Sequence, residues 1–122
     1  KEKITNDIIS GEVTPKKRTG IFSAFQDKPD PKVLIIQPQA AAHGVTLTAA
    51  DTIIWYGPPL SLETYLQANA RAHRKGQKNP LTIINLEGSY EESKVYSALV
   101  KKQNIHEQIV ELFKEKVDKV NN

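Results

Sequence analysis

A glutamine and two arginines recur at helical spacing in the middle of the sequence. Gln67, Arg71 and Arg74 stand at positions i, i+4 and i+7 of a helix expected over residues 61–74, which places all three on one helix face. Guanidinium groups bind phosphate oxygens through paired hydrogen bonds, and they stabilise the charge that develops when a phosphoryl group is transferred. The spacing therefore predicts a phosphate-facing site. The alternative is a solvated helix face that carries ordinary arginines.

Arginine is scarce in this chain, which gives the pair more weight. The seventeen basic residues comprise fourteen lysines and three arginines, namely Arg18, Arg71 and Arg74. Lysine supplies most of the solvated charge, so arginine is expected where its planar, permanently charged fork is needed. The net charge of +3 and the isoelectric point near 9.1 agree with a polyanionic partner but are weak evidence for one.

A loop of small residues at 40–51 is a second candidate for ligand contact. It follows an apolar run and reads A-A-A-H-G-V-T-L-T-A-A-D. Gly44 and the alanines let the backbone approach a ligand closely, and the hydroxyls of Thr46 and Thr48 can contact phosphate. The alternative is tight packing of small side chains, and His43 taken alone is an ordinary polar loop residue.

Several kinds of site are excluded by what the sequence lacks. The chain has no cysteine, and its three histidines lack the spacing of a zinc site, so we expect no metal centre. It has no G-x-x-x-x-G-K-[ST] phosphate cradle, no G-x-S-x-G nucleophile turn and no acidic pair after a strand to hold Mg²⁺. No apolar run approaches the roughly 18 residues of a membrane span, so we expect no membrane partner. Arginines that face phosphate, in a chain without a phosphate-binding loop or Mg²⁺ ligands, predict that this chain supplies one half of an active site.

The surrounding pattern predicts an α/β fold. Continuous apolar runs at 33–36, 52–56 and 81–86 are typical of strands buried on both faces of a parallel sheet, and a further strand ends before Gly11. Helices expected from Thr14 to about residue 27 and over 61–74 alternate with them. Ser89 and Glu92 form a capping box for a helical segment over 89–122. We expect one domain over 1–122, and the absence of methionine suggests a piece of a longer protein.

Two segments resemble conserved motifs of one protein family. Residues 67–77, Q-A-N-A-R-A-H-R-K-G-Q, closely resemble motif VI of the Swi/Snf-type ATPases of helicase superfamily two, Q-x-x-x-R-x-H-R-x-G-Q. Residues 41–51 resemble motif V, with alanines at 41 and 42 where the family has a glycine pair and Thr46 where it has asparagine. Arg18 and Phe25, followed by the strand at 33–35, match the helix and strand before motif V. The resemblance covers roughly residues 11–109, and shorter bacterial and phage members look similar near the end.

The resemblance implies the second RecA-like lobe of an ATP-dependent DNA translocase or helicase, truncated at its start, with an open, mainly parallel sheet and flanking helices. In that family ATP binds between two lobes, and the first lobe, absent from this sequence, holds Mg²⁺. The resemblance implies that Arg71 and Arg74 reach the γ-phosphate and that Gln67 positions the arginines or the attacking water. It also implies that Gly44 contributes to the ATP site and that His43, Thr46 and Thr48 contact the DNA backbone without sequence preference. The first lobe of the same protein is the other expected partner.

Other readings of the residues stay open at this point. A non-catalytic α/β module could grip nucleic acid or an acidic protein with its basic face. A small stand-alone phosphatase or nuclease is disfavoured because its nucleophile and metal ligands are missing. The cellular location expected for a translocase is the cytoplasm of a bacterium or a phage-infected host, or the nucleus of a eukaryote.

Overall fold

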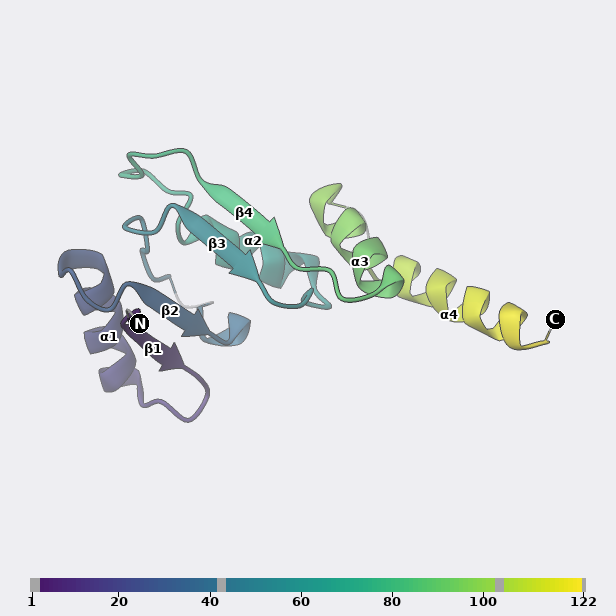
Figure 1. Cartoon of the computed structure of the whole chain (residues 1–122), viewed down its shortest axis with the longest axis horizontal. Coiled ribbons are helices and arrows are strands. Elements are labelled where there is room, and N and C mark those ends of the chain that lie inside the picture. Colours follow the sequence, from purple (N-terminus) through teal and green to yellow (C-terminus); the bar gives the residue numbers. More distant parts are fainter. Residues whose placement is uncertain (1–2, 42–43, 103–104, 122) are drawn as a thin grey trace.

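Strands and helices alternate along the chain, as expected for an α/β fold (Figure 1). The computed structural model describes residues 3–41, 44–102 and 105–121. The elements are β1 (Asn6–Ile9), α1 (Pro15–Asp27), β2 (Val33–Ile36), the 3-10 helix η1 (Pro38–Ala41), β3 (Thr52–Trp55), α2 (Leu62–Ala70), β4 (Thr82–Asn85), α3 (Tyr90–Val100) and α4 (Ile105–Asn121).

The predicted helix starts are confirmed by their caps. Thr14 Oγ1 accepts from the backbone N–H of Lys17 at 3.3 Å, with Pro15 at the first helical position of α1. Ser61 caps α2 and Ser89 caps α3 in the same way. The Glu92 carboxylate accepts from the N–H of Gly88 at 2.6 Å, and a Cβ at position 88 would lie 2.7 Å from that carboxylate, so a larger residue there would displace the Glu92 side chain.

The strands pair in parallel, in two separate pairs. β1 pairs with β2, with Ile8 opposite Ile35, and β3 pairs with β4, with Ile54 opposite Ile84. Within the described ranges, no backbone hydrogen bonds of a β-ladder join β2 to β3, so the expected open sheet is divided in two. All four arrows in Figure 1 nevertheless point the same way.

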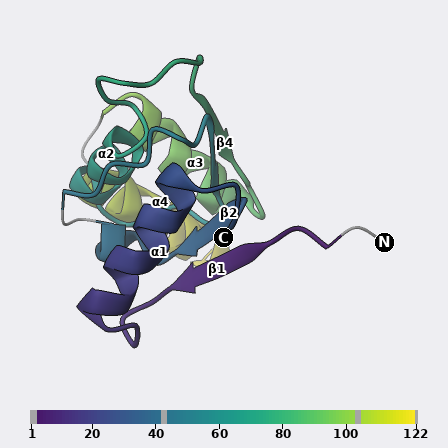
Figure 2. The ribbon, with the colours of Figure 1, turned by 90° about the vertical axis from the view of Figure 1, so that its left-hand side faces the viewer.

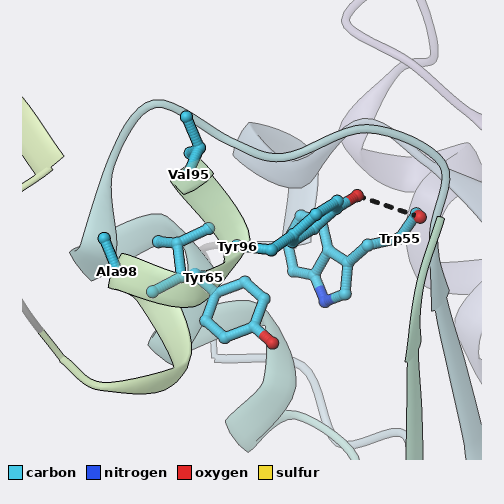
Figure 3. Close-up of a cluster of buried hydrophobic side chains, with 6 residues drawn as sticks. Trp55, Tyr65, Val95, Tyr96 and Ala98 are labelled. Carbon is cyan, nitrogen blue, oxygen red and sulfur yellow. Dashed lines mark hydrogen bonds between the residues drawn. The ribbon is translucent and has the colours of Figure 1, made fainter. Parts of the chain in front are cut away.

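Each strand pair has its own core on the helical side. Ile9, Phe22, Ala40 and Leu47 form the core between α1 and the β1–β2 pair. Trp55 anchors the other core, where its ring lies 5.1 Å from that of Tyr65 and its backbone carbonyl accepts from the hydroxyl of Tyr96 at 3.1 Å (Figure 3). Burial raises the pKa of Tyr96 to about 12, so this hydroxyl stays protonated and keeps its donor role at neutral pH.

The opposite face of both strand pairs is uncovered in the described chain. Ile8, Ile35, Ile54 and Ile84 are register partners on this face and are 40–61% exposed. Figure 2 shows α1 and α2 on one side of the strands, leaving the other side bare. The expectation that these strands are buried on both faces is therefore wrong for the described residues, because no described element packs against the second face.

The last two helices form the predicted C-terminal helical segment. The segment expected over 89–122 is divided into two helices, since α3 ends at Val100 and α4 begins at Ile105. Leu99 and Leu112 contribute to the Trp55 core, and Lys116 of α4 pairs with Glu91 of α3 at 3.1 Å. Among the described helices, none combines the length and the apolar character needed to cross a membrane.

Candidate phosphate-binding site

Helix α2 ends at Ala70, four residues earlier than predicted. The carbonyl of Arg71 accepts from the N–H of Leu47 at 2.8 Å, and the carbonyl of Ala72 accepts from Gln77 Nε2 at 2.9 Å. These carbonyls would otherwise accept from residues further along the helix, so the Leu47 amide from the loop and the Gln77 side chain five residues on replace the helical donors. Residues 71–77 therefore form a turn, here named the arginine turn, and the prediction that Arg74 shares a helix face with Gln67 is wrong.

The two residues on the end of α2 differ in their surroundings. Gln67 Nε2 donates to the Glu63 carboxylate at 2.9 Å, one helical turn earlier. Arg71 caps the C-terminus of α2 and is buried, with 9% of its surface exposed. Charged side chains are rarely buried to this extent in proteins. The burial of Arg71 argues against the alternative of a solvated helix face.

Arg74 reaches the small-residue loop. Its Nη1 donates to the Thr46 hydroxyl at 3.1 Å and to the Gly44 carbonyl at 3.3 Å. Gly44 has φ +76°, a left-handed conformation that favours glycine. The structure thus brings the predicted site residue Arg74 to Gly44 and Thr46, two predicted site residues that precede it by 30 and 28 positions. Thr46, expected to contact DNA, here contacts an arginine.

The other residues predicted for DNA contact are placed differently. The Thr48 hydroxyl accepts from Gln26 Nε2 at 2.8 Å, so Thr48 is bonded to α1, and the same hydroxyl lies near Gly76 of the arginine turn. The backbone N–H of Ala49 donates to Gln26 Oε1 at 3.0 Å. His43 lies outside the described residues.

Gln77 is the residue whose role the sequence reasoning missed. Its Nε2 donates to the carbonyls of Ala50, at 2.7 Å, and of Ala72, at 2.9 Å, so it joins the loop to the arginine turn. The signal was present, because Gln77 is the last residue of the motif VI-like run. Gln26 had no such signal. Arg18, the third arginine, donates to the carbonyls of Val13 and Ser10 and serves the fold.

An open hollow of about 410 Å³ borders the arginine turn. Arg74 and Lys75 carry positive charge on its wall, and no carboxylate lines it. Such a wall suits an anionic ligand. Within the described ranges, no group of three His, Cys, Asp or Glu side chains could hold a metal ion.

Comparisons with known proteins agree on one family. A family model described as "Helicase conserved C-terminal domain" matches residues 1–76. The chromodomain-helicase-DNA-binding protein 1-like of Danio rerio is 34% identical over 104 residues, which cover 84% of this chain and 10% of that protein. The chromatin-remodeling ATPase INO80 of Arabidopsis thaliana is 36% identical over 78 residues, which cover 64% of this chain and 5% of that protein. The lymphoid-specific helicase of Homo sapiens is 31% identical over 78 residues, which cover 64% of this chain and 9% of that protein.

A solved structure shows the same fold. The crystal structure of the C-terminal part of the Fun30 ATPase domain superposes with a TM-score of 0.68 at 23% identity, covering 76% of this chain and 30% of that chain. This confirms the RecA-like α/β architecture predicted from the sequence. The chain spans a tenth or less of the length of the curated relatives named above. It belongs to the family of the helicase conserved C-terminal domain, among the Swi/Snf-type ATPases of helicase superfamily two.

Proposed function

We propose that this chain is the second lobe of an ATP-dependent DNA translocase, with ATP bound between it and the first lobe of the same protein. The observation that carries the proposal is the arginine turn, which places Arg71 and Arg74 beside the loop at 44–51. The names of the relatives, which include a chromatin-remodeling ATPase and a helicase, support it. Those relatives are eukaryotic, which favours the nucleus over a bacterial or phage-infected cytoplasm.

Arg74 can bind a phosphate group without leaving the loop. A guanidinium has five N–H donors in a planar fork, and the two hydrogen bonds from Arg74 to the loop both use Nη1. Within the described residues no hydrogen bond uses Nη2 or Nε, and these groups would bind a γ-phosphate and stabilise the charge of the transition state. The phosphate cradle and the Mg²⁺ ligands would come from the first lobe, since the described residues of this chain supply neither.

The same loop would connect ATP to DNA. Thr46 accepts from Arg74, and Thr48 lies two residues further along the loop, next to α1. If Thr46, Thr48 and His43 contact phosphates of the DNA backbone, a change at Arg74 on hydrolysis shifts those contacts. Cycles of lobe closure would then move the protein along the duplex.

We also propose that residues 1–122 act as one domain, completed by a strand and a helix from the same protein. A strand between β2 and β3 would pair with the free edge of β2 on one side and the free edge of β3 on the other. The crossover from β1 through α1 to β2 places its helix on one face. A second crossover, from the added strand to β1, would run across the sheet in the opposite direction. Because crossovers of this kind are right-handed, its helix would lie on the opposite face, over exposed Ile8 and Ile35.

Cysteine pairs in the full-length protein test this arrangement. The pair Ile8→Cys and Ile35→Cys joins register partners on adjacent strands and should form a disulfide on oxidation. The pair Ile35→Cys and Ile54→Cys should not, because an intervening strand sets β2 and β3 about 10 Å apart. A disulfide between positions 35 and 54, detected by mass spectrometry, would contradict the added strand.

The isolated chain is expected to hydrolyse no ATP and to bind it weakly. The arginines act on a nucleotide that the first lobe must hold, so this chain alone lacks half of the site. A phosphate-release assay on the purified chain measures this directly. Turnover above background that is abolished by a mutation in this chain would refute the half-site proposal.

DNA binding by the isolated chain is expected to be weak, salt-sensitive and independent of sequence. Contacts to phosphates release counterions, so affinity falls steeply as salt rises. Titration of short duplexes, followed residue by residue by NMR, should perturb Thr46, Thr48 and neighbouring lysine-bearing loops. Binding that survives molar salt, or that strongly prefers one sequence, would rule out the phosphate-backbone explanation.

A further inference from the structure

The side chain of Gln77 makes three hydrogen bonds in and around the arginine turn. Its Nε2 donates to the carbonyls of Ala50 and Ala72, at 2.7 and 2.9 Å, and its Oε1 accepts from the N–H of Asn79 at 3.3 Å. Carbonyl groups only accept hydrogen bonds, so position 77 requires a side chain that donates twice. The Gln77 side chain is also partly buried, which strengthens these bonds relative to those in water.

The two carbonyls belong to the two segments that the proposed function must couple. Ala50 ends the loop just before β3, and Ala72 lies between Arg71 and Arg74 in the arginine turn. Further contacts between described residues join the same segments, namely Leu47 N–H to the Arg71 carbonyl and Arg74 to the start of the loop. Under the proposed function, the Arg74 contact involves the side chain that binds phosphate, so it shifts on hydrolysis. The Gln77 contacts involve no ligand-binding atom and can persist throughout.

We propose that Gln77 is a positioning residue that holds the loop at 44–51 and the arginine turn together as one unit. It sets where Arg71 and Arg74 stand relative to the loop, and it transmits a displacement of the turn to Thr46 and Thr48. This inference rests on the proposed function for its catalytic consequence. The hydrogen-bonded unit itself exists whether or not the protein hydrolyses ATP.

Gln26 provides a matched control on the same loop. Its amide contacts the Thr48 hydroxyl and the Ala49 N–H, and it ties the loop to α1 instead of to the arginine turn. A carboxylate at position 26 can keep both bonds, since the threonine hydroxyl can donate as well as accept. A carboxylate at position 77 would face two carbonyls with no proton between them. The same Gln→Glu change therefore keeps the local hydrogen bonds at position 26 and breaks them at position 77.

The experiment compares Gln77→Glu, Gln77→Lys and Gln26→Glu in the full-length protein, with DNA-stimulated ATP hydrolysis as the first readout. Misplacing catalytic groups by about 1 Å can cost about 10²-fold in rate, so Gln77→Glu should lower kcat by at least about tenfold with little change in the KM for ATP. Gln77→Lys, whose ammonium donates to both carbonyls, should recover most of the loss. Gln26→Glu should keep the wild-type rate of ATP hydrolysis measured without DNA, because its carboxylate lies beside Thr48 and bears only on the proposed DNA contact.

Hydrogen exchange without nucleotide is the second readout. Gln77→Glu should speed exchange of the Leu47 and Ala50 amides, both bonded in the native loop and turn, and leave β1 and β2 unchanged. If wild type hydrolyses no ATP, the proposed function fails while the exchange result still tests the unit. Wild-type exchange and turnover in Gln77→Glu, or equal losses in Gln77→Lys and Gln77→Glu, would overturn the inference.

Discussion

Replacing Arg74 with alanine in the full-length protein is expected to lower kcat for ATP hydrolysis by at least about 10²-fold and to leave the KM for ATP nearly unchanged. Arginines that contact the transferred phosphoryl group from a second domain are worth about 10³–10⁵ in rate. A contact made mainly in the transition state affects kcat, whereas uniform binding affects KM. Arg74→Lys should not restore the rate fully, because a single ammonium cannot reproduce the planar fork.

His73 is the internal control for this measurement. It lies in the same turn with its side chain exposed, and it makes none of the contacts to the loop that Arg74 makes. His73→Ala should therefore be milder than Arg74→Ala in steady-state kinetics. Wild-type turnover in Arg74→Ala would make this arginine structural.

Arg71→Ala should reduce kcat similarly but should also lower the melting temperature. Loss of a guanidinium that stood in an open, phosphate-facing site would leave the fold intact. Arg71 is instead buried, and removing a buried charged side chain disturbs the groups packed around it. The comparison of melting curves for the two alanine variants separates the catalytic effect from the structural one.

Leu99→Ala is expected to cause the largest loss of stability, about 2–5 kcal/mol in the free energy of unfolding. Leu99 is 1% exposed in the core with Trp55 and Tyr96, so its removal leaves a cavity as well as losing buried apolar surface. Its neighbour Val100 is 63% exposed, and Val100→Ala should cost far less. Urea unfolding followed by Trp55 fluorescence measures both. Equal losses would mean that α3 does not hold this core.

Local chemistry made most of the elements predictable. Thr14, Ser61 and Ser89 cap their helices through hydrogen bonds to residues three positions away, which the sequence alone specifies. The strand at 33–36 appears with the predicted bounds because a continuous apolar run favours a strand. The same run wrongly predicted burial of both faces, since burial depends on which other segments are present.

The end of α2 and the partners of the site residues depended on distant contacts. Leu47 and Gln77 donate to the carbonyls of Arg71 and Ala72, which would otherwise have accepted from the next turn of the helix. No pattern within residues 61–74 indicates these two donors. The resemblance to motif VI identified the arginines, and the structure placed Arg74 against Gly44. The resemblance could not indicate that Thr46 would contact Arg74 or that Thr48 would contact Gln26, because both pairs form only when the loop folds back.

A crystal structure of the full-length protein with DNA, ADP, Mg²⁺ and tetrafluoroaluminate would test the central claim most directly. Tetrafluoroaluminate mimics the phosphoryl group in transfer. We expect guanidinium nitrogens of both Arg71 and Arg74 within hydrogen-bond distance of its fluorides, at about 3 Å. A complex in which the fluorides contact only the first lobe, with no arginine nitrogen of this chain nearby, would contradict the assignment of this lobe to the ATPase site.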